Sequence, residues 1–505
     1  MNRRDFIKLA GALPVGLGLQ PLLRRWGPSQ PGADDRPNVL VIVFDAFSAR
    51  HISLHGYARE TTPNLARLAE RAIVYHNHYA GGNYTTPGTA SLLTGTLPWT
   101  HRAFQPNSRV AEAFARRSLF HAFRRHHRLA YSHNLLVNTL FKQFAEDLDE
   151  YVPRDQLFVT SDLFLHKAFA KDEDIADVAW ARTAKRQDYG YAYSLFLSQL
   201  YLPYLQYKTA NVARRFPLGL PSINSGNFFL LEDAVDWIVG RIGGLPQPYM
   251  GYFHFLPPHK PSAPPSEFFR IFAQDLYQSP VKPPDPLAGW KETPRNMDKE
   301  RREYDEYILY VDREFGRLFD RLEESGALSN TWVVLSSDHG ELFERGFRGH
   351  GGPLFYEGVV RVPLMIFEPK RTERVDIQVR TSGVDVLPTL LHVTGEQAVD
   401  WTDGSVLPPF APADPERPVY ALDARKANPD GPIEAATLML IKGRYKLTYF
   451  FGYKELGEGV ERVDLFDIES DPEELNNLYT EGNEIGASML ALLKGKLEQV
   501  NAPYL

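Results

Sequence analysis

Asn38-Val39-Leu40-Val41-Ile42-Val43-Phe44-Asp45 is the stretch of sequence that decides the fold class. Its apolar, largely β-branched residues would point to both faces of a strand, which is typical of a central strand in a sheet covered on both sides. Residues 250–255 and 331–335 predict further strands of the same sheet, and helical patterns lie between them, for example over residues 64–72 and 305–324. Because strands alternate with helices, we expect an α/β fold with a large, mostly parallel sheet flanked by helices.

The length of 505 residues allows one large domain and a smaller one. A proline-rich stretch over residues 408–418 predicts the boundary between them. We therefore expect an α/β domain over residues 37–410 and a small α+β domain over residues 411–505, made of a hairpin, a short strand and a closing helix. Residues from about 152 to 225 fit the alternation of strands and helices poorly, and they predict a helical insertion within the larger domain.

Residues 1–36 resemble an export signal followed by a linker. Arg3 and Arg4 precede a mildly apolar stretch over residues 9–19, which is too short to span a bilayer. The paired arginines are similar to those of a twin-arginine signal, so we expect export to the periplasm or cell envelope. A basic first helix of the fold is the alternative. No A-x-A cleavage site is evident, so the segment could stay attached and hold the protein near a membrane.

The composition excludes some classes of function. The formal charge of −7 provides no basic footprint for nucleic acid, so we expect no nucleic-acid partner. The chain contains no cysteine, which excludes disulfides, thiolate metal sites and cysteine nucleophiles together. Any nucleophile or metal ligand must therefore be sought among the other polar side chains.

Metal-ligand residue types follow two of the predicted strands. Asp45 comes directly after the first strand, and Asp338-His339 follows the strand at 331–335 after two serines. In open parallel sheets, ligands bind outside the carboxyl ends of the strands. One acid after a strand is usually a turn former or a helix cap, but two strands that share the arrangement predict a site.

Residues 85–95 form a third candidate segment. Pro87 suits the first turn of a helix, Thr85 or Thr86 suits the N-cap, and Gly95 suits the C-terminal stop. A threonine hydroxyl at that place lies against exposed backbone N–H groups and the positive end of the helix dipole, which favours a phosphate or sulfate. An ordinary capped helix is the alternative interpretation.

Five segments occur in the order seen in sulfatases: Asp45 after its strand, residues 85–95, Pro257-Pro258-His259-Lys260-Pro261, Ser337-Asp338-His339-Gly340 and Tyr356-Glu357-Gly358-Val359-Val360-Arg361-Val362-Pro363. Together they resemble the sulfatase N-terminal domain of the alkaline phosphatase superfamily. The resemblance covers about residues 37–400, and residues 445–447 and 464–478 resemble the sulfatase C-terminal region. It implies an alkaline-phosphatase-like fold.

The nucleophile position departs from the sulfatase pattern. Sulfatases carry C-x-P-x-R or S-x-P-x-R, whose first residue is oxidised to formylglycine. Here Thr85 stands at that position, Pro87 is kept, and Thr89 replaces the arginine. Oxidation of a secondary alcohol would give a ketone and no aldehyde, so the familiar route is closed. The segment instead resembles the threonine nucleophile segment of phosphodiesterases and of phosphoglycerol or phosphoethanolamine transferases in the same superfamily.

A second departure is Ala46, where many sulfatases have another aspartate, and no second set of ligands with two-zinc spacing is evident. The resemblance therefore implies one divalent metal ion, bound by Asp45, Asp338, His339 and the oxygen of Thr85. Three oxygens and one imidazole suit Mn²⁺, Mg²⁺, Ca²⁺ and Zn²⁺ alike.

The resemblance also implies roles on the substrate side. Thr85 would attack phosphorus and form a covalent intermediate that water or an acceptor alcohol resolves. His259, or alternatively His254, would contact the anion or protonate the leaving oxygen, and His350 is similar to a substrate-side histidine of the family. Further candidate contacts to the anionic substrate are Lys260, Thr89 and Thr86, and Thr86 is also the rival of Thr85 as nucleophile.

Three functions remain open at this level. The first is a phosphoesterase or phosphotransferase that acts on an anionic ester of a glycan, a lipid headgroup or a small molecule. The second is a sulfuric ester hydrolase with an unmodified threonine. The third is an inactive sulfatase-like protein that binds anionic glycans, since Ala46 and Thr89 could reflect lost activity.

Overall fold

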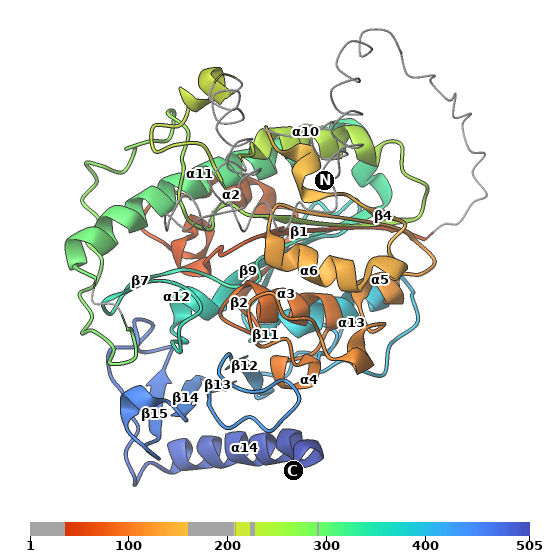
Figure 1. Ribbon diagram of the computed structural model, residues 1–505. Helices are drawn as coiled ribbons and strands as arrows, with labels where there is room; N and C mark the ends of the chain where they lie inside the picture. The colour runs from red at the N-terminus through yellow and green to blue at the C-terminus, as the bar shows by residue number, and fades with distance from the viewer. Residues whose placement is uncertain (1–35, 160–206, 208, 223–227, 290–291) are drawn as a thin grey trace, which may run out of the picture. The chain divides into compact units, whose positions relative to one another are not determined.

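The computed structural model describes residues 36–159, 207, 209–222, 228–289 and 292–505 (Figure 1). The predicted export signal lies outside these ranges, apart from Arg36, and so does most of the predicted helical insertion. Within the described ranges, strands and helices alternate as the sequence predicts.

The central element of the fold is a nine-stranded sheet. Its strands are β1 (Asn38–Phe44), β2 (Ile73–Tyr79), β3 (His127–Ser132), β4 (Glu150–Tyr151), β5 (Tyr249–Phe255), β6 (Thr331–Ser336), β9 (Arg361–Phe367), β10 (Val375–Ile377) and β11 (Thr381–Ser382). Their order is β10-β2-β9-β6-β1-β5-β3-β4, and β11 pairs with β2. β1 runs parallel to β5 and β6, whereas β9 runs antiparallel to β2 and β6. The sheet is therefore mixed and mostly parallel, which confirms the predicted fold class.

Helices cover both faces of this sheet (Figure 1). One face carries α2 (Pro63–Ala69), α10 (Leu231–Ile242) and α11 (Pro294–Glu324), and the other carries α3 (Thr85–Thr94), α5 (Leu119–Ala122), α6 (Leu135–Gln143) and α13 (Val386–Val393). Because side chains alternate along a strand, Leu40 and Ile42 of β1 pack into the core of the first face, and Val41 and Val43 pack into that of the second. This alternation explains why β1 is apolar throughout.

The C-terminal part forms a second, antiparallel sheet. It consists of β12 (Val419–Asp423), β13 (Ala436–Lys442), β14 (Tyr445–Phe451) and β15 (Arg462–Asp467), in that order, with α14 (Glu484–Asn501) packed against it. The predicted hairpin, short strand and closing helix are therefore confirmed. Val359 and Val360 of α12 (Glu357–Val360) share an apolar cluster with Met439 and Ile441 of this sheet. The domain boundary near residue 410 stays a prediction.

Short elements connect these layers: β7 (Leu342–Glu344) pairs with β8 (Phe347–Gly349), and α4 (Pro98–His101) follows α3. Short 3-10 helices lie at Ala49–His51, Ser53–His55, Glu112–Phe114, Ala145–Asp147, Arg154–Leu157, Ala327–Asn330, Gly383–Asp385, Lys454–Leu456 and Ala502–Tyr504.

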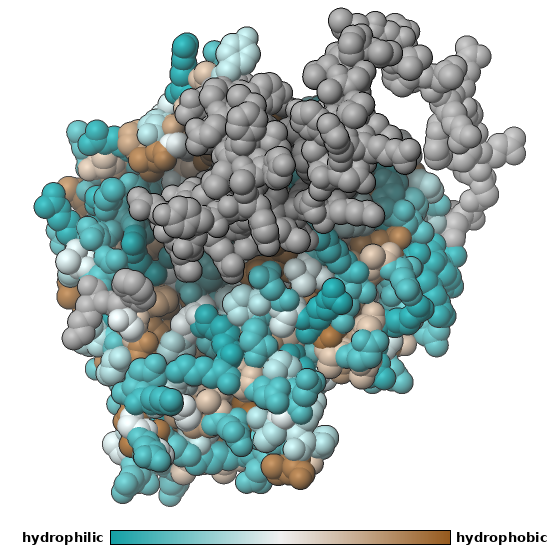
Figure 2. Space-filling model, in the orientation of Figure 1, coloured by the Kyte–Doolittle hydropathy of each residue, from teal (hydrophilic) through white to brown (hydrophobic). Residues whose placement is uncertain are grey.

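The coloured part of the face in Figure 2 is mostly hydrophilic, with scattered apolar residues. Ile271, Leu276 and Val281 are large apolar side chains exposed in one loop. Among the helices within the described ranges, none has the length and apolar character that a membrane crossing requires.

Candidate active site

The carboxyl ends of three neighbouring strands bring four polar side chains together. Asp45 follows β1 directly, and its backbone N–H donates to Phe255 O at the end of β5. His254 lies in β5 opposite Val43 of β1, and Asp338 and His339 follow β6. Because β1 lies between β5 and β6 and runs parallel to both, these residues meet at one edge of the sheet.

The four side chains form a buried cluster of two carboxylates and two imidazoles. His254 Nε2 is 3.3 Å from Asp45 Oδ2 and 3.6 Å from Asp338 Oδ2. His339 Nε2 is 3.3 Å from Asp45 Oδ1 and 3.7 Å from Asp338 Oδ2. The structure thus brings together the three strand-end residues predicted as metal ligands. It adds His254, which the sequence had suggested as a contact to the anion or as a proton donor, and not as a metal ligand.

The cluster has the donor set and the electrostatics of a cation site. One ligand atom each from Asp45, His254 and Asp338 lies within 4.8 Å of the others. Burial raises the pKa of Asp338, and the charge of Asp45 raises it further. Burial would lower the pKa of His339, but Asp338 and Asp45 raise it to about 9. Two buried carboxylates are stable only if positive charge lies beside them. A divalent cation bound to the oxygen and imidazole ligands would supply that charge.

Two details of hydrogen bonding support this interpretation. Among the described residues, Asp45 Oδ1 has no hydrogen-bond partner although it is buried. His339 Nδ1 lies 2.9 Å from Gly340 O, and because a carbonyl only accepts, Nδ1 carries the hydrogen. Nε2 then faces the carboxylates, and a backbone carbonyl that fixes the ring in this way is typical of metal-binding histidines.

Helix α3 begins at Thr85, and its N-cap is Tyr84. The expectation that Thr85 or Thr86 is the N-cap is therefore wrong. Tyr84 is the last residue with an extended backbone, and its carbonyl already accepts from the N–H of Gly88. Gly95 ends the helix in the left-handed conformation, as predicted.

The hydroxyl of Thr85 reaches the cluster. Thr85 Oγ1 lies 3.4 Å from His339 Nε2 and 3.5 Å from Asn134 Nδ2. The same Asn134 amide donates to Asp45 Oδ2. The hydroxyl of Thr86 is also buried, but it has no hydrogen-bond partner within the described part of the chain. Thr85, and not Thr86, therefore meets the candidate metal ligands.

The first turn of α3 packs closely on the loop after β6. A Cβ atom on Gly88 would lie 2.1 Å from the carbonyl oxygen of Asp338, so only glycine fits there without a shift. One residue later, Thr89 Oγ1 donates to Asp338 Oδ2 over 3.3 Å. Thr89 thus contacts a candidate metal ligand.

Asn134 is a residue that the sequence analysis missed. It follows β3, and its side-chain oxygen accepts from Leu136 N, so it is also the N-cap of α6. β3 pairs with β5 in parallel, which brings its carboxyl end to the same edge of the sheet. The sequence does contain a signal for Asn134: it is a polar residue that comes shortly after another strand of the sheet, β3.

His259, Lys260 and His350 gather on the side of the cluster that is more open to solvent. The ring centroid of His350 is 4.4 Å from that of His339 and 4.7 Å from that of His259. The side chain of Lys260 is 38% exposed and that of His350 is 15% exposed, whereas Asp338 is fully buried. The residues expected to contact substrate therefore lie between the metal ligands and the solvent.

Glu341 is a second residue that the sequence analysis missed. Its carboxylate is buried, with Oε2 at 2.6 Å from His350 Nδ1 and Oε1 at 3.3 Å from Lys260 Nζ. Burial would raise its pKa, but His350 and Lys260 hold the pKa of Glu341 well below its usual range. The carboxylate can only accept, so His350 Nδ1 carries the hydrogen. Burial lowers the pKa of His350 to about 4, which leaves its Nε2 as an unprotonated acceptor at neutral pH.

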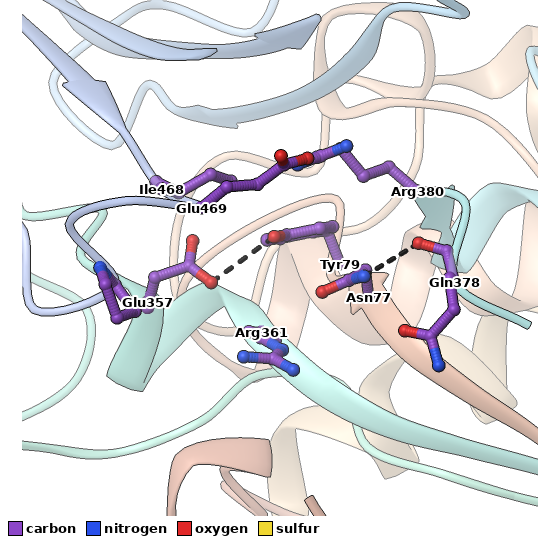
Figure 3. Close-up of a pocket in the computed structure, with 9 residues that line it drawn as sticks. Asn77, Tyr79, Glu357, Arg361, Gln378, Arg380, Ile468 and Glu469 are labelled. Atoms are coloured by element: carbon purple, nitrogen blue, oxygen red, sulfur yellow. Dashed lines mark hydrogen bonds and ion pairs between the residues drawn. The ribbon is translucent and has the colours of Figure 1, made fainter. Parts of the chain in front are cut away.

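A cavity of about 250 Å³ lies elsewhere in the described part of the chain, and none of the candidate metal ligands lines it (Figure 3). In Figure 3, Tyr79 points to Glu357, and Arg380 lies beside Glu469. Its wall includes α12, whose Gly358 carbonyl would lie 2.3 Å from a Cβ on Gly340. Neither Thr85 nor a candidate metal ligand lines this cavity, so it is not part of the candidate active site.

Curated relatives match most of the chain. A choline-sulfatase of Rhizobium meliloti (strain 1021) is 25% identical over 479 residues, which cover 88% of this chain and 82% of that protein. The multifunctional alkaline phosphatase superfamily protein PehA of Trinickia caryophylli is 25% identical over 499 residues, which cover 88% of this chain and 91% of that protein.

Solved structures share the fold. The phosphonate monoester hydrolase of Agrobacterium radiobacter superposes with a TM-score of 0.65 at 19% identity, over 93% of this chain and 96% of that one. The model of the sulfatase family matches residues 37–161 and 224–396, which include every strand-end residue of the cluster and Thr85. The chain therefore belongs to the sulfatase family and is a hydrolase of that family.

Proposed function

We propose that the protein is an exported, metal-dependent esterase that uses Thr85 as its nucleophile and favours phosphate monoesters and diesters over sulfate esters. The observation that carries the proposal is the position of the Thr85 hydroxyl, 3.4 Å from His339 Nε2 and beside the carboxylate cluster. The first turn of α3 follows this hydroxyl, so the positive end of the helix dipole lies next to it and favours an anionic substrate.

Asp45, Asp338, His339 and His254 would hold one divalent metal ion, together with the oxygen of Thr85. When bound, such an ion would neutralise the carboxylates, screen the substrate's charge and make a neighbouring hydroxyl more acidic. The donor set does not select among Mn²⁺, Mg²⁺, Ca²⁺ and Zn²⁺. Asn134 would orient Thr85 and Asp45 through its single amide group.

In the first step, Thr85 Oγ1 attacks phosphorus and passes its proton to solvent. The bond between oxygen and phosphorus forms while the bond from phosphorus to the leaving oxygen breaks. His259 gives a proton to that oxygen; its Nδ1 lies 2.6 Å from Lys260 O, so Nε2 is the nitrogen left for the substrate. The products of this step are a free alcohol and a phosphothreonine, which keeps its second ester group when the substrate is a diester.

In the second step, water attacks phosphorus while the bond between phosphorus and Thr85 Oγ1 breaks, and Thr85 Oγ1 takes a proton from solvent; this releases the phosphate and restores the hydroxyl. His350 suits the role of proton acceptor for this water, because its Nδ1–H is held by Glu341 and its Nε2 is unprotonated at neutral pH. Lys260 provides positive charge near the departing phosphate, with its amino group kept in place by Glu341. An acceptor alcohol in place of water would make the enzyme a transferase of the phosphoglycerol or phosphoethanolamine type.

A sulfuric ester hydrolase with an unmodified threonine is the second candidate. It is favoured by the similarity to the choline-sulfatase. The third candidate is an inactive protein that binds anions. It is disfavoured because the residues needed for catalysis keep chemically competent side chains: Thr85, Asp45, Asp338, His339 and His259. The preference for phosphate rests on threonine at the nucleophile position, which cannot yield the aldehyde.

Two measurements test the proposal. Purified protein is assayed with bis-p-nitrophenyl phosphate and p-nitrophenyl sulfate, with and without Mn²⁺, and we expect the phosphate to turn over faster. Mass spectrometry of protein quenched during turnover should then find a phosphate-containing adduct, p-nitrophenyl phosphate from this diester, on the Thr85 peptide. Thr85→Val should abolish the adduct and the activity, whereas Thr86→Val should retain both. Faster sulfate turnover, or an adduct elsewhere, contradicts the proposal.

Export rests on the sequence alone and has its own test. Replacing Arg3 and Arg4 by lysine should keep the protein inside the cell, because the twin-arginine route requires that pair. Arg24 and Arg25 form a second pair that lies outside the start of the signal, and the same replacement there is the matched control. Equal amounts of both variants in the periplasmic fraction would reject the twin-arginine assignment.

A further inference from the structure

We infer that a pocket lined by the C-terminal sheet region and by the loop after His350 binds the alcohol part of the ester, and that it accepts a neutral, hydroxyl-rich group such as a sugar ring. The inference rests on the proposed function. The pocket has a volume of about 140 Å³, and the residues that line it include Pro353, Asp423, Arg425, Lys426, Tyr453 and Glu455. Most of them come from the C-terminal sheet region, which contributes none of the catalytic residues described above.

Arg425 connects this pocket to the nucleophile. Its guanidinium carbon lies 4.7 Å from the ring centroid of Tyr84, the residue that precedes Thr85 and caps its helix. A Cβ on Gly351 would lie 3.1 Å from Arg425 Nη1 and 3.2 Å from the Cβ of Tyr84. Gly351 follows His350, so Arg425 contacts the chain next to both the nucleophile and a substrate-side histidine.

The loop that carries His350 is hydrogen-bonded to Asn83, two residues before Thr85. Gly351 N donates to Asn83 O over 2.9 Å, and the side chain of Asn83 donates to Leu354 O over 3.2 Å. Pro353, which lines the pocket, lies between these two contacts. One loop therefore carries both His350 and the pocket residue Pro353, which places the pocket next to the segment that bears the substrate-side histidine.

The charges of the lining point to a neutral polar ligand. Arg425 pairs with Asp423 at 3.0 Å, and Lys426 pairs with Glu455 at 3.3 Å, so the two positive and two negative groups balance. Among the described residues, Arg425 Nη1 has no hydrogen-bond acceptor, and the Lys426–Glu455 pair is exposed, so its donors and acceptors remain available to hydroxyl groups. A charged ligand would have to displace one partner of a pair.

The remaining wall is formed by Leu287, Pro353 and the ring of Tyr453, over which Lys426 Nζ lies 4.9 Å from the ring centroid. Leu287 and Tyr453 are buried and belong to one apolar cluster, and the hydroxyl of Tyr453 is engaged with Thr437 Oγ1 at 2.8 Å. The volume of about 140 Å³ is well below the roughly 300–1,000 Å³ of pockets that hold drug-sized ligands. It therefore suits one ring-sized group with an apolar face and a hydroxylated edge.

The test compares two leaving groups in the full-length, metal-loaded enzyme. The kcat/KM for a hexose 6-phosphate is divided by that for p-nitrophenyl phosphate, whose leaving group has no such hydroxyls. We expect this ratio to fall at least tenfold in Lys426→Ala and in Arg425→Ala. The matched control is Lys494→Ala, since Lys494 is also half-exposed, pairs with Glu461 at 2.8 Å and lies over Tyr449. Its ratio should equal that of the parent.

A binding measurement separates the pocket from the catalytic proposal. Methyl glucoside, which carries no phosphate, is titrated against the same proteins by saturation-transfer NMR. Binding to the parent and to Lys494→Ala, with at least tenfold weaker binding to Lys426→Ala, supports the pocket even if neither phosphate ester turns over, a result that would reject only the proposed function. An unchanged ratio, or glucoside binding unaffected by Lys426→Ala, overturns the inference.

Discussion

His350 Nδ1 lies 2.6 Å from Oε2 of the buried Glu341. The other oxygen of the carboxylate is 3.3 Å from Lys260 Nζ, so one acid orients two substrate-side groups. It also sets the tautomer of His350, because a carboxylate can only accept the hydrogen bond. Glu341 therefore acts on the reaction through its neighbours and is a positioning residue.

Glu341→Gln should lower kcat/KM by roughly 10–100-fold, the usual cost of removing a partner that orients a site residue. Metal content should not change, because Glu341 contacts His350 and Lys260 and none of the candidate metal ligands. Steady-state kinetics with bis-p-nitrophenyl phosphate, combined with metal analysis, check both statements. Glu344→Gln is the control, since this nearby carboxylate pairs with Lys282 instead. Equal activity of the two variants would show that Glu341 has no positioning role.

Asn134→Asp should reduce metal affinity and activity at least tenfold. The variant keeps the oxygen that caps α6 but replaces the amide donor, which serves Asp45 and Thr85, by a carboxylate that repels Asp45. Asn134→Ala should lose the donor and the cap, at a further cost of about 1 kcal/mol in the free energy of unfolding. Metal titration and thermal unfolding distinguish the two effects. Unaltered metal affinity in Asn134→Asp would argue against its orienting role.

Gly88→Ala should disrupt the site, because the added Cβ would meet the carbonyl oxygen of Asp338 at 2.1 Å. We expect a loss of about 1–3 kcal/mol in the free energy of unfolding, together with loss of activity as Thr85 moves away from the cluster. Gly240→Ala is the matched control, since Gly240 lies in helix α10 with no atom within 4 Å of the added Cβ. That variant should be as stable as the parent or more stable. Chemical denaturation and activity assays provide the comparison.

His133→Phe should make the protein more resistant to acid. Burial, and to a smaller extent the charge of His254, lower the pKa of His133 from 6.5 to about 3. Between these two values the folded state binds fewer protons than the unfolded state, so the free energy of unfolding falls as pH drops below 6.5. Phenylalanine keeps the stacking on Phe229 and does not titrate.

The gain from His133→Phe should therefore depend on pH. At pH 5 the titration of His133 costs about 2 kcal/mol, and this cost should be absent at pH 8. Melting temperatures of both proteins at the two pH values test the prediction. A difference between the proteins that is the same at pH 5 and pH 8 would mean that His133 is not buried in its neutral form.

Local patterns in the sequence were enough to identify the architecture. The apolar run of β1 predicts a central strand because both faces of that strand are buried, and the structure has Val41 and Ile42 in different cores. Asp45 and the Asp338-His339 pair could be named as one site because each follows a strand within two residues, and parallel strands end at the same edge. These inferences need only the period of the side chains and the direction of the strands.

Strand order and helix packing decided which other side chains join the candidate site. His254 joins the carboxylates because β5 pairs with β1, and Asn134 reaches Thr85 although 49 residues separate them, since β3 lies next to β5. The choice of Thr85 over Thr86 depends on where α3 starts and on how closely Gly88 approaches Asp338. The sequence by itself determined the fold class and the residue types at the strand ends. Only the tertiary structure decided which side chains meet, because contacts between distant segments depend on strand register and packing, which local periodicity does not encode.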